Sequence, residues 1–443
     1  MPAAETAPAL PASRLTLTDL HSPPMRAFHL SWMSFFLCFF AWFGVAPLMP
    51  IIRQEFGLTR DQVGWSIIGS VAITIFARLA IGRLCDRYGP RLTYAWLLLA
   101  GSLPVMGIAL AADFWSFLLF RVLIGVIGAS FVVTQYHTTK MFSSTCVGAA
   151  NATAAGWGNL GGGVTQIVMP ALFAFFTLTC GLSAAVGWRA CMILAGLVCA
   201  LTGVAYYYWT QDTPAGNLID LRRRGLLPAD SRQQSGLSVA LRDHRVWSLF
   251  VLYGCSFGLE LTLDNVAVLY FTDYLHFDLH QAGWAAGAFG LMNLFARALG
   301  GLLSDRCAKV WGFTGRSRWL FLTILGEGLA LLLFSQMTQA GWSIATLLLV
   351  GLFVKMSNGA VYAVVPFVNA KALGSVAGVV GAGGNLGAVA AGFLFKSDLP
   401  WTAGFWILGL CVTGCALLAI TLPWQLAPAD GRAEADQLAV AAP

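Results

Sequence analysis

The sequence is poor in charged residues, which excludes an ordinary water-soluble fold. Asp, Glu, Lys and Arg make up 10% of the 443 residues, whereas soluble domains carry about a quarter. Hydrophobic residues account for 58% of the chain, more than a soluble protein of this length can bury. Apolar stretches recur from Leu30 to Trp424, each of about twenty residues, the length that crosses a bilayer core of roughly 30 Å. The sequence therefore predicts an all-α membrane protein surrounded by lipid.

The chain also lacks the patterns of several other protein classes. Its ten cysteines form no CxxC pair, so neither a disulfide framework nor a zinc site is predicted. No metal cluster, nucleophile–base set or nucleotide loop indicates an enzyme, and no cofactor is expected. The net charge of +6 comes from basic residues in short loops, not from a stripe that would follow a nucleic-acid backbone. We therefore expect neither an enzyme nor a nucleic-acid-binding protein.

The apolar stretches divide into two sets of six. The expected spans cover residues 30–52, 64–84, 92–111, 114–142, 147–177, 188–209, 246–272, 281–304, 318–338, 341–366, 374–397 and 401–424. The widest polar gap lies between the sixth and seventh spans and is the expected linker. We predict a disordered cytoplasmic tail at 1–25, a six-helix bundle at 26–209, a cytoplasmic linker at 210–245, a second six-helix bundle at 246–424 and a cytoplasmic tail at 425–443.

The basic residues indicate the orientation in the membrane. Most of them fall in loops on the same side as the N-terminus and the linker, and the opposite loops hold chiefly Arg53, Arg60 and Lys396. The basic residues on the first side are Arg83, Arg87, Arg91, the linker arginines, Arg306, Lys309, Arg316 and Arg318. The positive-inside rule then places both termini in the cytoplasm. A multi-pass protein of the cell inner (plasma) membrane is expected.

The two halves repeat each other in sequence. Two motifs of the first half recur with identical internal spacing in the second. They are Ala77-Arg78, Gly82 and Asp86-Arg87, repeated as Ala296-Arg297, Gly301 and Asp305-Arg306, and Gly158-Asn159-Leu160-Gly161, repeated as Gly384-Asn385-Leu386-Gly387. Repeated bundles that rock about a shared central site are typical of alternating-access carriers.

The loop after the second span carries a superfamily motif. The stretch 82–91, Gly-Arg-Leu-Cys-Asp-Arg-Tyr-Gly-Pro-Arg, resembles the loop motif of the major facilitator superfamily, and 301–306 is a degenerate copy. The resemblance implies a cytoplasmic gate formed by Asp86, Arg87, Asp305 and Arg306. The alternative is a positive-inside anchor in which Gly-Pro forms the turn.

Arg78 and Arg297 are expected close to the membrane midplane. Each precedes its loop aspartate by eight residues, about 12 Å along a helix. A guanidinium at that depth costs at least ~2.5 kcal/mol on insertion scales, so it should face a polar cavity. The repeat would bring the two arginines to one central point, where their planar donors suit a small planar oxyanion. Alternatively, each arginine pairs with an acid such as Glu260 or Asp264 to hold helices together.

Two glycine-rich stretches lie inside apolar spans, at 156–163 and 381–387. They are not phosphate loops, because no Lys-Ser/Thr and no strand-to-helix context accompanies them. Glycines let helices pack closely, which is the simplest interpretation. Each stretch also holds one asparagine, Asn159 or Asn385, whose amide group can donate to an anion.

Both stretches resemble the paired nitrate signatures of the nitrate/nitrite porter family within that superfamily. The segments 134–142 and 151–159, and Phe28–Phe36 with Ala46-Pro47-Leu48, resemble high-affinity nitrate transporters of plants, algae, fungi and bacteria. This resemblance spans about 26–395 and implies the major facilitator fold, with twelve transmembrane helices in two six-helix bundles.

The resemblance also implies a substrate site. Arg78 and Arg297 match the substrate arginines of the family, Asn159 matches the signature asparagine, and Tyr253 matches a tyrosine that faces the substrate. Asn385 is the corresponding residue of the second half, although the sequence departs from the family pattern after Gly387.

The seventh span carries two carboxylates, Glu260 and Asp264, one turn apart and so on one helical face. They are candidates for proton coupling or structural partners of arginines. Arg121 resembles a second superfamily motif that is linked in symporters to proton coupling. Lys355 either strengthens anion attraction or pairs with Glu327.

We therefore expect a transporter of nitrate, and of nitrite, that works as a monomer by alternating access, with proton-coupled uptake. Nitrate/nitrite exchange is the competing coupling mode. Two further functions would use the same residues: a carrier of another small anion, and a membrane sensor that binds without net transport.

Overall fold

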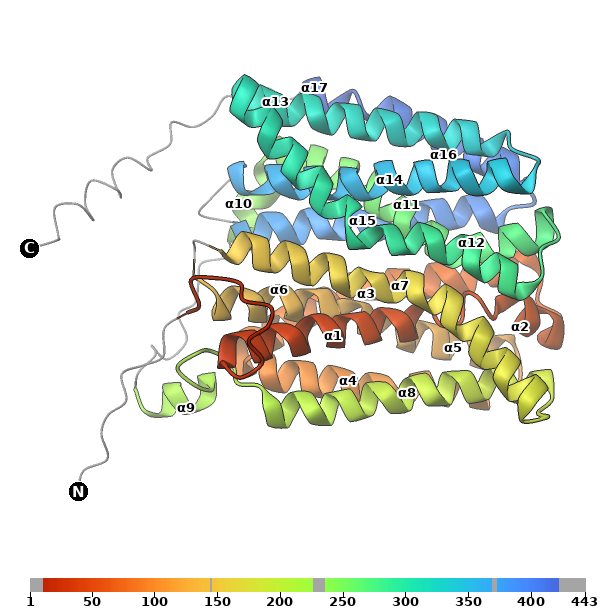
Figure 1. The fold of residues 1–443 in the computed structure, drawn as a ribbon, viewed down its shortest axis with the longest axis horizontal. Helices are drawn as coiled ribbons and strands as arrows, with labels where there is room; N and C mark the ends of the chain where they lie inside the picture. Colours follow the sequence, from red (N-terminus) through yellow and green to blue (C-terminus); the bar gives the residue numbers. More distant parts are fainter. Residues whose placement is uncertain (1–10, 144–145, 226–235, 369–372, 422–443) are drawn as a thin grey trace, which may run out of the picture.

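The computed structural model describes residues 11–143, 146–225, 236–368 and 373–421. Within these ranges the regular elements are helices, most of them long and roughly parallel to one another (Figure 1). We call residues 23–209 the N-half and 244–421 the C-half. In Figure 1 the N-half fills the lower part of the bundle and the C-half the upper part.

The N-half contains eight α-helices joined by short turns. They are α1 (Pro23–Phe43), α2 (Met49–Phe56), α3 (Arg60–Tyr88), α4 (Pro90–Gly107), α5 (Phe114–Gly125), α6 (Ser130–Met141), α7 (Val147–Ala174) and α8 (Ala184–Trp209). The short helix α9 (Leu218–Arg223) and helix α10 (Gly236–Arg242) occupy part of the polar gap. We call the end of the bundle where α9 and α10 lie the linker end, and the opposite end, near α2, the far end (Figure 1).

The described part of the C-half contains seven α-helices. They are α11 (His244–Tyr274), α12 (Leu279–Leu291), α13 (Ala296–Ser335), α14 (Ala340–Val364), α15 (Leu373–Lys396), α16 (Trp401–Cys415) and α17 (Leu418–Thr421). Both halves begin at the linker end. Part of the predicted N-terminal tail lies against the N-half, because Ala12 exchanges backbone hydrogen bonds with Met141 and Ser143.

Ten helices of the described chain are long and apolar enough to cross a membrane. One of them, Leu279–Ser335, has 57 residues, more than twice the length that one crossing needs. It folds back at Trp311 and Gly312, whose backbone is not helical and where Gly312 has a φ of 60°. The first predicted span, 30–52, is interrupted instead at 44–48, between α1 and α2. The exact number of twelve crossings therefore stays a prediction.

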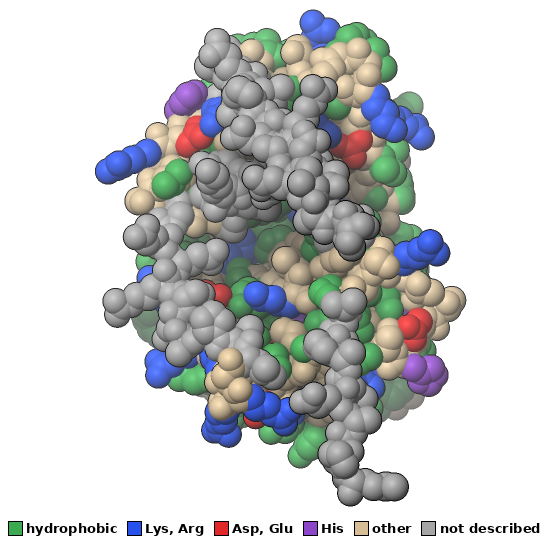
Figure 2. All heavy atoms as spheres, turned by 90° about the vertical axis from the view of Figure 1, so that its left-hand side faces the viewer, with side chains coloured by type: hydrophobic (Ala, Val, Ile, Leu, Met, Phe, Trp, Pro, Cys, Tyr) green, Lys and Arg blue, Asp and Glu red, His purple; other side chains and the backbone are tan. Residues whose placement is uncertain are grey.

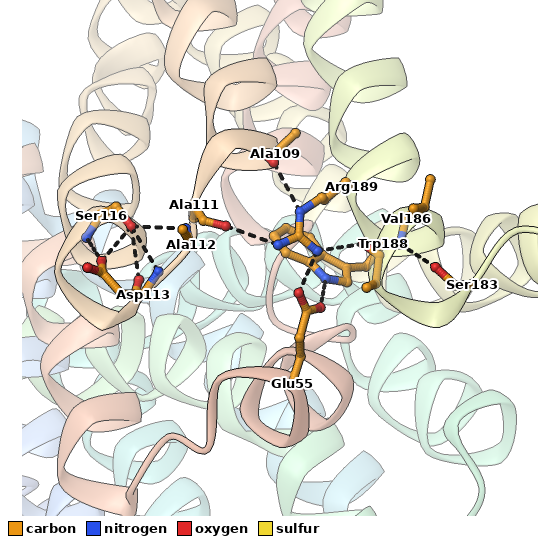
Figure 3. Close-up of polar contacts among 11 residues, drawn as sticks. Glu55, Ala109, Ala111, Ala112, Asp113, Ser116, Ser183, Val186, Trp188 and Arg189 are labelled. Atoms are coloured by element: carbon orange, nitrogen blue, oxygen red, sulfur yellow. Dashed lines mark hydrogen bonds and ion pairs between the residues drawn. The ribbon is translucent and has the colours of Figure 1, made fainter.

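Polar side chains define where several helices begin. Thr59 and Gln62 form a capping box at the start of α3, and Asp113 and Ser116 form one at the start of α5 (Figure 3). Hydrogen bonds from the Ser116 hydroxyl and backbone N–H lower the pKa of the Asp113 carboxyl. These caps satisfy N–H groups that have no partner within the first helical turn.

A polar brace holds α2 against the rest of the N-half at the far end (Figure 3). Glu55 of α2 accepts from the Arg189 guanidinium at 2.7 Å and from the Trp188 indole N–H at 2.6 Å. Arg189 also donates to the backbone oxygens of Ala109 and Ala111. The side chains of α8 thereby fix the short helix α2 and the end of α4 together.

Glycines allow the two halves to approach closely along two interfaces, where α7 packs on α12 and α15 packs on α3. A Cβ on Gly163 would lie 2.5 Å from the carbonyl carbon of Gly290, and a Cβ on Gly392 would lie 2.6 Å from a side-chain carbon of Ile68. Larger side chains would push the helices apart at these points.

The linker end is rich in basic side chains. Lys and Arg lie around this face, which is hollowed near its centre (Figure 2). Arg222 of α9 donates to the backbone oxygens of Asp86 and Arg87. Asp212 accepts from the backbone N–H groups of Arg91 and Leu218, although burial raises the pKa of its carboxyl. The first part of the polar gap is therefore bound to the N-half.

Candidate functional site

Arg78 and Arg297 face the same aromatic ring from opposite halves. Arg78 extends from α3 and Arg297 from the start of α13. Their guanidinium carbons lie 6.0 and 5.9 Å from the centre of the Phe257 ring, so they are at most about 12 Å apart, twice that distance. The Phe131 ring lies 5.5 Å from the Arg78 guanidinium carbon. The sequence repeat thus corresponds to two cations near one point between the halves.

Both guanidinium groups keep unused hydrogen-bond donors. Arg78 Nη1 donates to the Gly381 oxygen at 3.1 Å, and Arg297 Nη2 donates to the Tyr253 hydroxyl at 3.0 Å. Arg78 Nε and Nη2 and Arg297 Nη1 are buried and have no acceptor within the described parts of the chain. Neither arginine forms an ion pair with a described carboxylate. A small oxyanion between the two groups would satisfy these donors.

Aromatic side chains form the walls around the arginines. The Tyr253 ring stacks on Phe257, with ring centres 5.1 Å apart, and Tyr362 meets Tyr253 edge to face at 5.0 Å. A Cβ on Gly381 would lie 3.2 Å from the Tyr362 hydroxyl, so the glycine leaves room for that group. The sequence reasoning did not single out Tyr362. The sequence feature that could have identified Tyr362 is its position, as an aromatic residue with a hydroxyl group inside an apolar span.

The two signature asparagines lie at the two interfaces between the halves. Asn159 shares a face of α7 with Gly156 and Gly163, which contact Asn293 and Gly290 of the C-half. Asn385 shares a face of α15 with Gly381 and Gly392, which face α3. Both asparagine side chains are buried, and their amide atoms have no hydrogen bond to any described residue. No hydrogen bond joins either one to the arginines within the described chain, so a substrate contact stays a prediction.

The proposed gate residues lie at the linker end, and three of them, Asp86, Arg87 and Asp305, have polar partners there. The Asp86 and Arg87 backbone oxygens accept from Arg222, and Asp305 forms an ion pair with Arg316. Among the described residues, no ion pair connects the loop of one half with that of the other. Asp86, Arg87, Asp305 and Arg306 are exposed.

Glu260 of α11 is surrounded by polar partners from the C-half. It accepts from Asn293 at 2.8 Å and from Asn358 at 2.6 Å, and Lys355 Nζ lies 2.6 Å from Glu260 Oε1. Lys355 thus pairs with Glu260 and not, in this conformation, with Glu327. Both carboxyl oxygens of Glu260 therefore have partners.

Asp264, one turn further along α11, has different surroundings. Its Oδ1 is buried without a partner in the described chain. A Cβ on Gly162 of the N-half would lie 3.1 Å from Asp264 Oδ2. Asp264 therefore lies at the interface between the halves.

Arg121 also bridges the halves. It is buried and donates to the Trp42 oxygen at 3.2 Å and to Asn265 Oδ1, on the C-half, at 3.3 Å. Neither acceptor is a carboxylate. A role in proton coupling therefore stays a prediction, and the contacts themselves describe a brace between α5 and α11.

The far end is closed by contacts between the halves. Arg53 forms an ion pair with Asp273 at 2.6 Å, and Lys396 forms one with Asp61 at 2.9 Å. Arg60 also lies over the Trp401 ring, at 4.9 Å from its centre. The sequence reasoning treated these basic residues only as loop charges, because pairing between distant spans has no local sequence signal.

Comparison with known proteins identifies the class. The model of the Major Facilitator Superfamily matches residues 31–263 and 250–441, so the chain belongs to this superfamily. A solved bacterial homologue of the human lysosomal transporter Spinster, in an inward-facing conformation, has the same fold. It superposes with a TM-score of 0.65 at 16% identity, over 90% of this chain and 96% of that one.

Within the superfamily, the chain belongs to the family of the nitrate transporters. The high affinity nitrate transporter 2.5 of Arabidopsis thaliana is 36% identical over 92% of this chain and 81% of its own length. The nitrate transporter 2.1 of Chlamydomonas reinhardtii is 36% identical over 89% and 74% of the two chains. A nitrate/nitrite transporter of Picosynechococcus sp. is 28% identical over 82% and 83%. These relatives are transporters and not enzymes, as the sequence predicts.

Proposed function

We propose that the protein transports nitrate, and nitrite, by alternating access, with the anion bound between Arg78 and Arg297. The observation that carries this proposal is the set of buried guanidinium donors without an acceptor in the described chain, one set from each half. Nitrate is planar and offers acceptor oxygens at its edges, which suits the planar donors of two arginines. An anion that contacts both halves also provides the differential binding that a conformational change requires.

The conformation supports a carrier that is open toward the linker end. Two ion pairs join the halves at the far end, whereas the linker end is hollowed (Figure 2). By the positive-inside rule, the basic side chains of the linker end support a cytoplasmic location for that end. On this proposal the protein lies in the inner (plasma) membrane with its linker inside, and the state is inward-open.

The net charge of the anion site supports coupling of anion transport to protons. One monovalent anion leaves the two arginines with a net positive charge, and an empty carrier with two facing cations would close poorly. A carboxylate that ionises when the anion has left would remove this barrier and give proton-coupled uptake. Glu260 and Asp264, both on α11, are the candidates for this carboxylate. If no acid titrates, nitrate/nitrite exchange results, because the carrier then returns only with an anion bound.

Arg297→Lys tests the anion site. A lysine keeps the charge but loses the planar set of donors, so we expect nitrate uptake into proteoliposomes to fall at least about tenfold. The matched control is Arg318→Lys at the exposed linker end, which should transport like the wild type. Uptake near the wild-type rate in Arg297→Lys would show that Arg297 does not bind the anion. Competition by phosphate or small carboxylates would indicate a different anion, and binding without flux would indicate a sensor.

A further inference from the structure

Glu327 is a buried carboxyl group that the proposed anion site does not use. Its side chain, on α13, is fully buried, and neither carboxyl oxygen has a hydrogen bond to the described residues. The polar groups facing it are the Ser357 hydroxyl and Lys355 ammonium of α14 and the Glu260 carboxylate of α11. An ionised carboxylate without hydrogen bonds is strongly disfavoured in such surroundings. These surroundings therefore favour the neutral, protonated form of Glu327.

Lys355 lies between competing carboxylates. Its ammonium group is 2.6 Å from Glu260 and 4.2 Å from the centre of the Phe289 ring. Glu327 and Asp264 also lie within electrostatic range of it. One ammonium neutralises one carboxylate, so the acid that pairs with Lys355 is ionised and an unpaired buried acid tends to hold a proton.

Glu260 connects this cluster with the anion site. It lies within electrostatic range of Arg297, whose guanidinium donates to Tyr253. A bound anion offsets the charge of Arg297 and leaves Glu260 with Lys355. When the anion leaves, Arg297 attracts Glu260 more strongly, and the ion pair between Glu260 and Lys355 weakens.

We propose that Glu327 binds the transported proton, and that Lys355 exchanges Glu260 for Glu327 as its ionic partner when the anion leaves. This inference rests on the proposed nitrate transport and names its coupling residue. In the loaded carrier Glu327 is protonated. After anion release, Glu260 moves toward Arg297, and Glu327 gives its proton to water on the side of release and pairs with Lys355. One proton is then released with each anion.

The charges in the two states are consistent with this exchange. The loaded site has three cations, Arg78, Arg297 and Lys355, and two anions, Glu260 and the substrate. The empty site has the same cations and two anions, Glu260 and Glu327. The net charge is thus equal in both, so the empty carrier does not face a greater repulsion between its halves than the loaded one.

Among the described residues, a cysteine thiol also lies near Glu327. Cys255 of α11 lies within its electrostatic range and contacts Cys415 of α16. Asp264 is the one other carboxylate near Lys355 among the described residues. Asp264 lies against the N-half, whereas Glu327 lies within the C-half. If Asp264 carries the proton, Asp264→Asn loses coupling, and if Glu327 carries it, Glu327→Gln does.

The experiment uses the purified full-length protein in proteoliposomes with two readouts, nitrate/nitrite counterflow and proton movement driven by a nitrate gradient. For Glu327→Gln we expect counterflow within about twofold of the wild type and at least a roughly tenfold loss of protons moved per nitrate. Glu327→Asp keeps a titratable group and should retain both readouts. Asp278→Asn, which changes an exposed helix cap, is the control and should change neither.

The outcomes separate this inference from the proposed function. Absence of nitrate flux in the wild type contradicts the proposed function itself. Normal proton movement in Glu327→Gln overturns the inference, and loss of proton movement in Asp264→Asn alone places the proton on Asp264. If Glu327→Gln does not accumulate, infrared difference spectra of the wild type decide. Nitrate binding at constant pH should increase the signal of a protonated carboxylic acid, and an unchanged signal would overturn the inference.

Discussion

Arg53 of α2 and Asp273 of α11 form a two-bond ion pair between the halves. Arg53 Nη1 donates to Asp273 Oδ2 at 2.7 Å, and Nη2 donates to Oδ1 at 2.6 Å. Lys396 and Asp61 form a second ion pair between the halves, through a single contact of 2.9 Å. Because each pair joins one half to the other at the far end, opening that end requires both pairs to break.

Asp273→Asn should therefore shift the carrier toward the state that is open at the far end. A partly exposed ion pair contributes about 0.5–1 kcal/mol, which corresponds to a roughly two- to fivefold change in population. The measurement is the labelling rate of a single cysteine at Ile67, on the buried interface at this end, in a cysteine-free background. The control is Asp278→Asn, because Asp278 makes no contact between the halves in the described chain. Unchanged or slower labelling in Asp273→Asn would contradict the role of the pair.

Gly163→Ala should impair transport more than an equal change elsewhere on α7. The added methyl group would lie 2.5 Å from the backbone of Gly290, and overpacking of this kind costs about 1–3 kcal/mol. We expect slower nitrate/nitrite counterflow because the two halves cannot reach their close contact. Gly148→Ala is the matched control on the same helix, since no atom lies within 4 Å of its added carbon. Equal rates for the two variants would show that this contact does not limit the cycle.

The sequence predicted the main features of the fold because they depend on composition and repetition. The apolar spans, the polar gap and the paired motifs all persist along the chain, and the family resemblance agrees with them. The convergence of Arg78 and Arg297 followed from their depth and their repeat relation. The break at 44–48 was missed because the stretch is apolar and was counted as part of one continuous span, although Gly44 and Pro47 are residues that often end a helix.

The side-chain partners of the site were less predictable. Pairing between Lys355 and Glu260 depends on how α14 and α11 are rotated about their axes, which sequence spacing alone does not fix. Glu327 was considered only as a partner for Lys355, and Tyr362 was not considered. Such contacts join helices far apart in sequence, so no local pattern identifies them.

Asp243→Ala should lower stability at neutral pH but not in acid. Partial burial favours the neutral acid, but hydrogen bonds from Arg245 outweigh it and hold the pKa of Asp243 below its usual value. The ionised carboxylate caps α11 through the Arg245 backbone N–H, and loss of such a cap costs about 1 kcal/mol. A carboxyl whose pKa is lowered by folding stabilises the protein above its unfolded pKa, near 3.8, and this contribution disappears as the pH falls through the lower folded value.

Thermal unfolding in detergent at several pH values measures this effect. The difference between wild type and Asp243→Ala should be largest near pH 7 and should narrow below about pH 4. Asp113→Ala, which removes a cap at the opposite end of the molecule, should show the same sign of pH dependence because the pKa of its carboxyl is also lowered. A difference that is constant with pH would mean that the carboxylate charge of Asp243 does not contribute.

Glu55→Gln should loosen α2 from the N-half. The carboxylate accepts from both Arg189 and Trp188 (Figure 3), and the amide replaces one acceptor oxygen with a donor that faces one of these N–H groups. We expect a loss of about 1–2 kcal/mol, which lowers the unfolding temperature by a few degrees. Asp113→Asn, which keeps a capping side chain at the neighbouring helix start, is the matched control. Because α2 also carries Arg53, Glu55→Gln should in addition raise cysteine labelling at Ile67. If the variant unfolds and is labelled like the wild type, the polar contacts of Glu55 do not hold α2 in place.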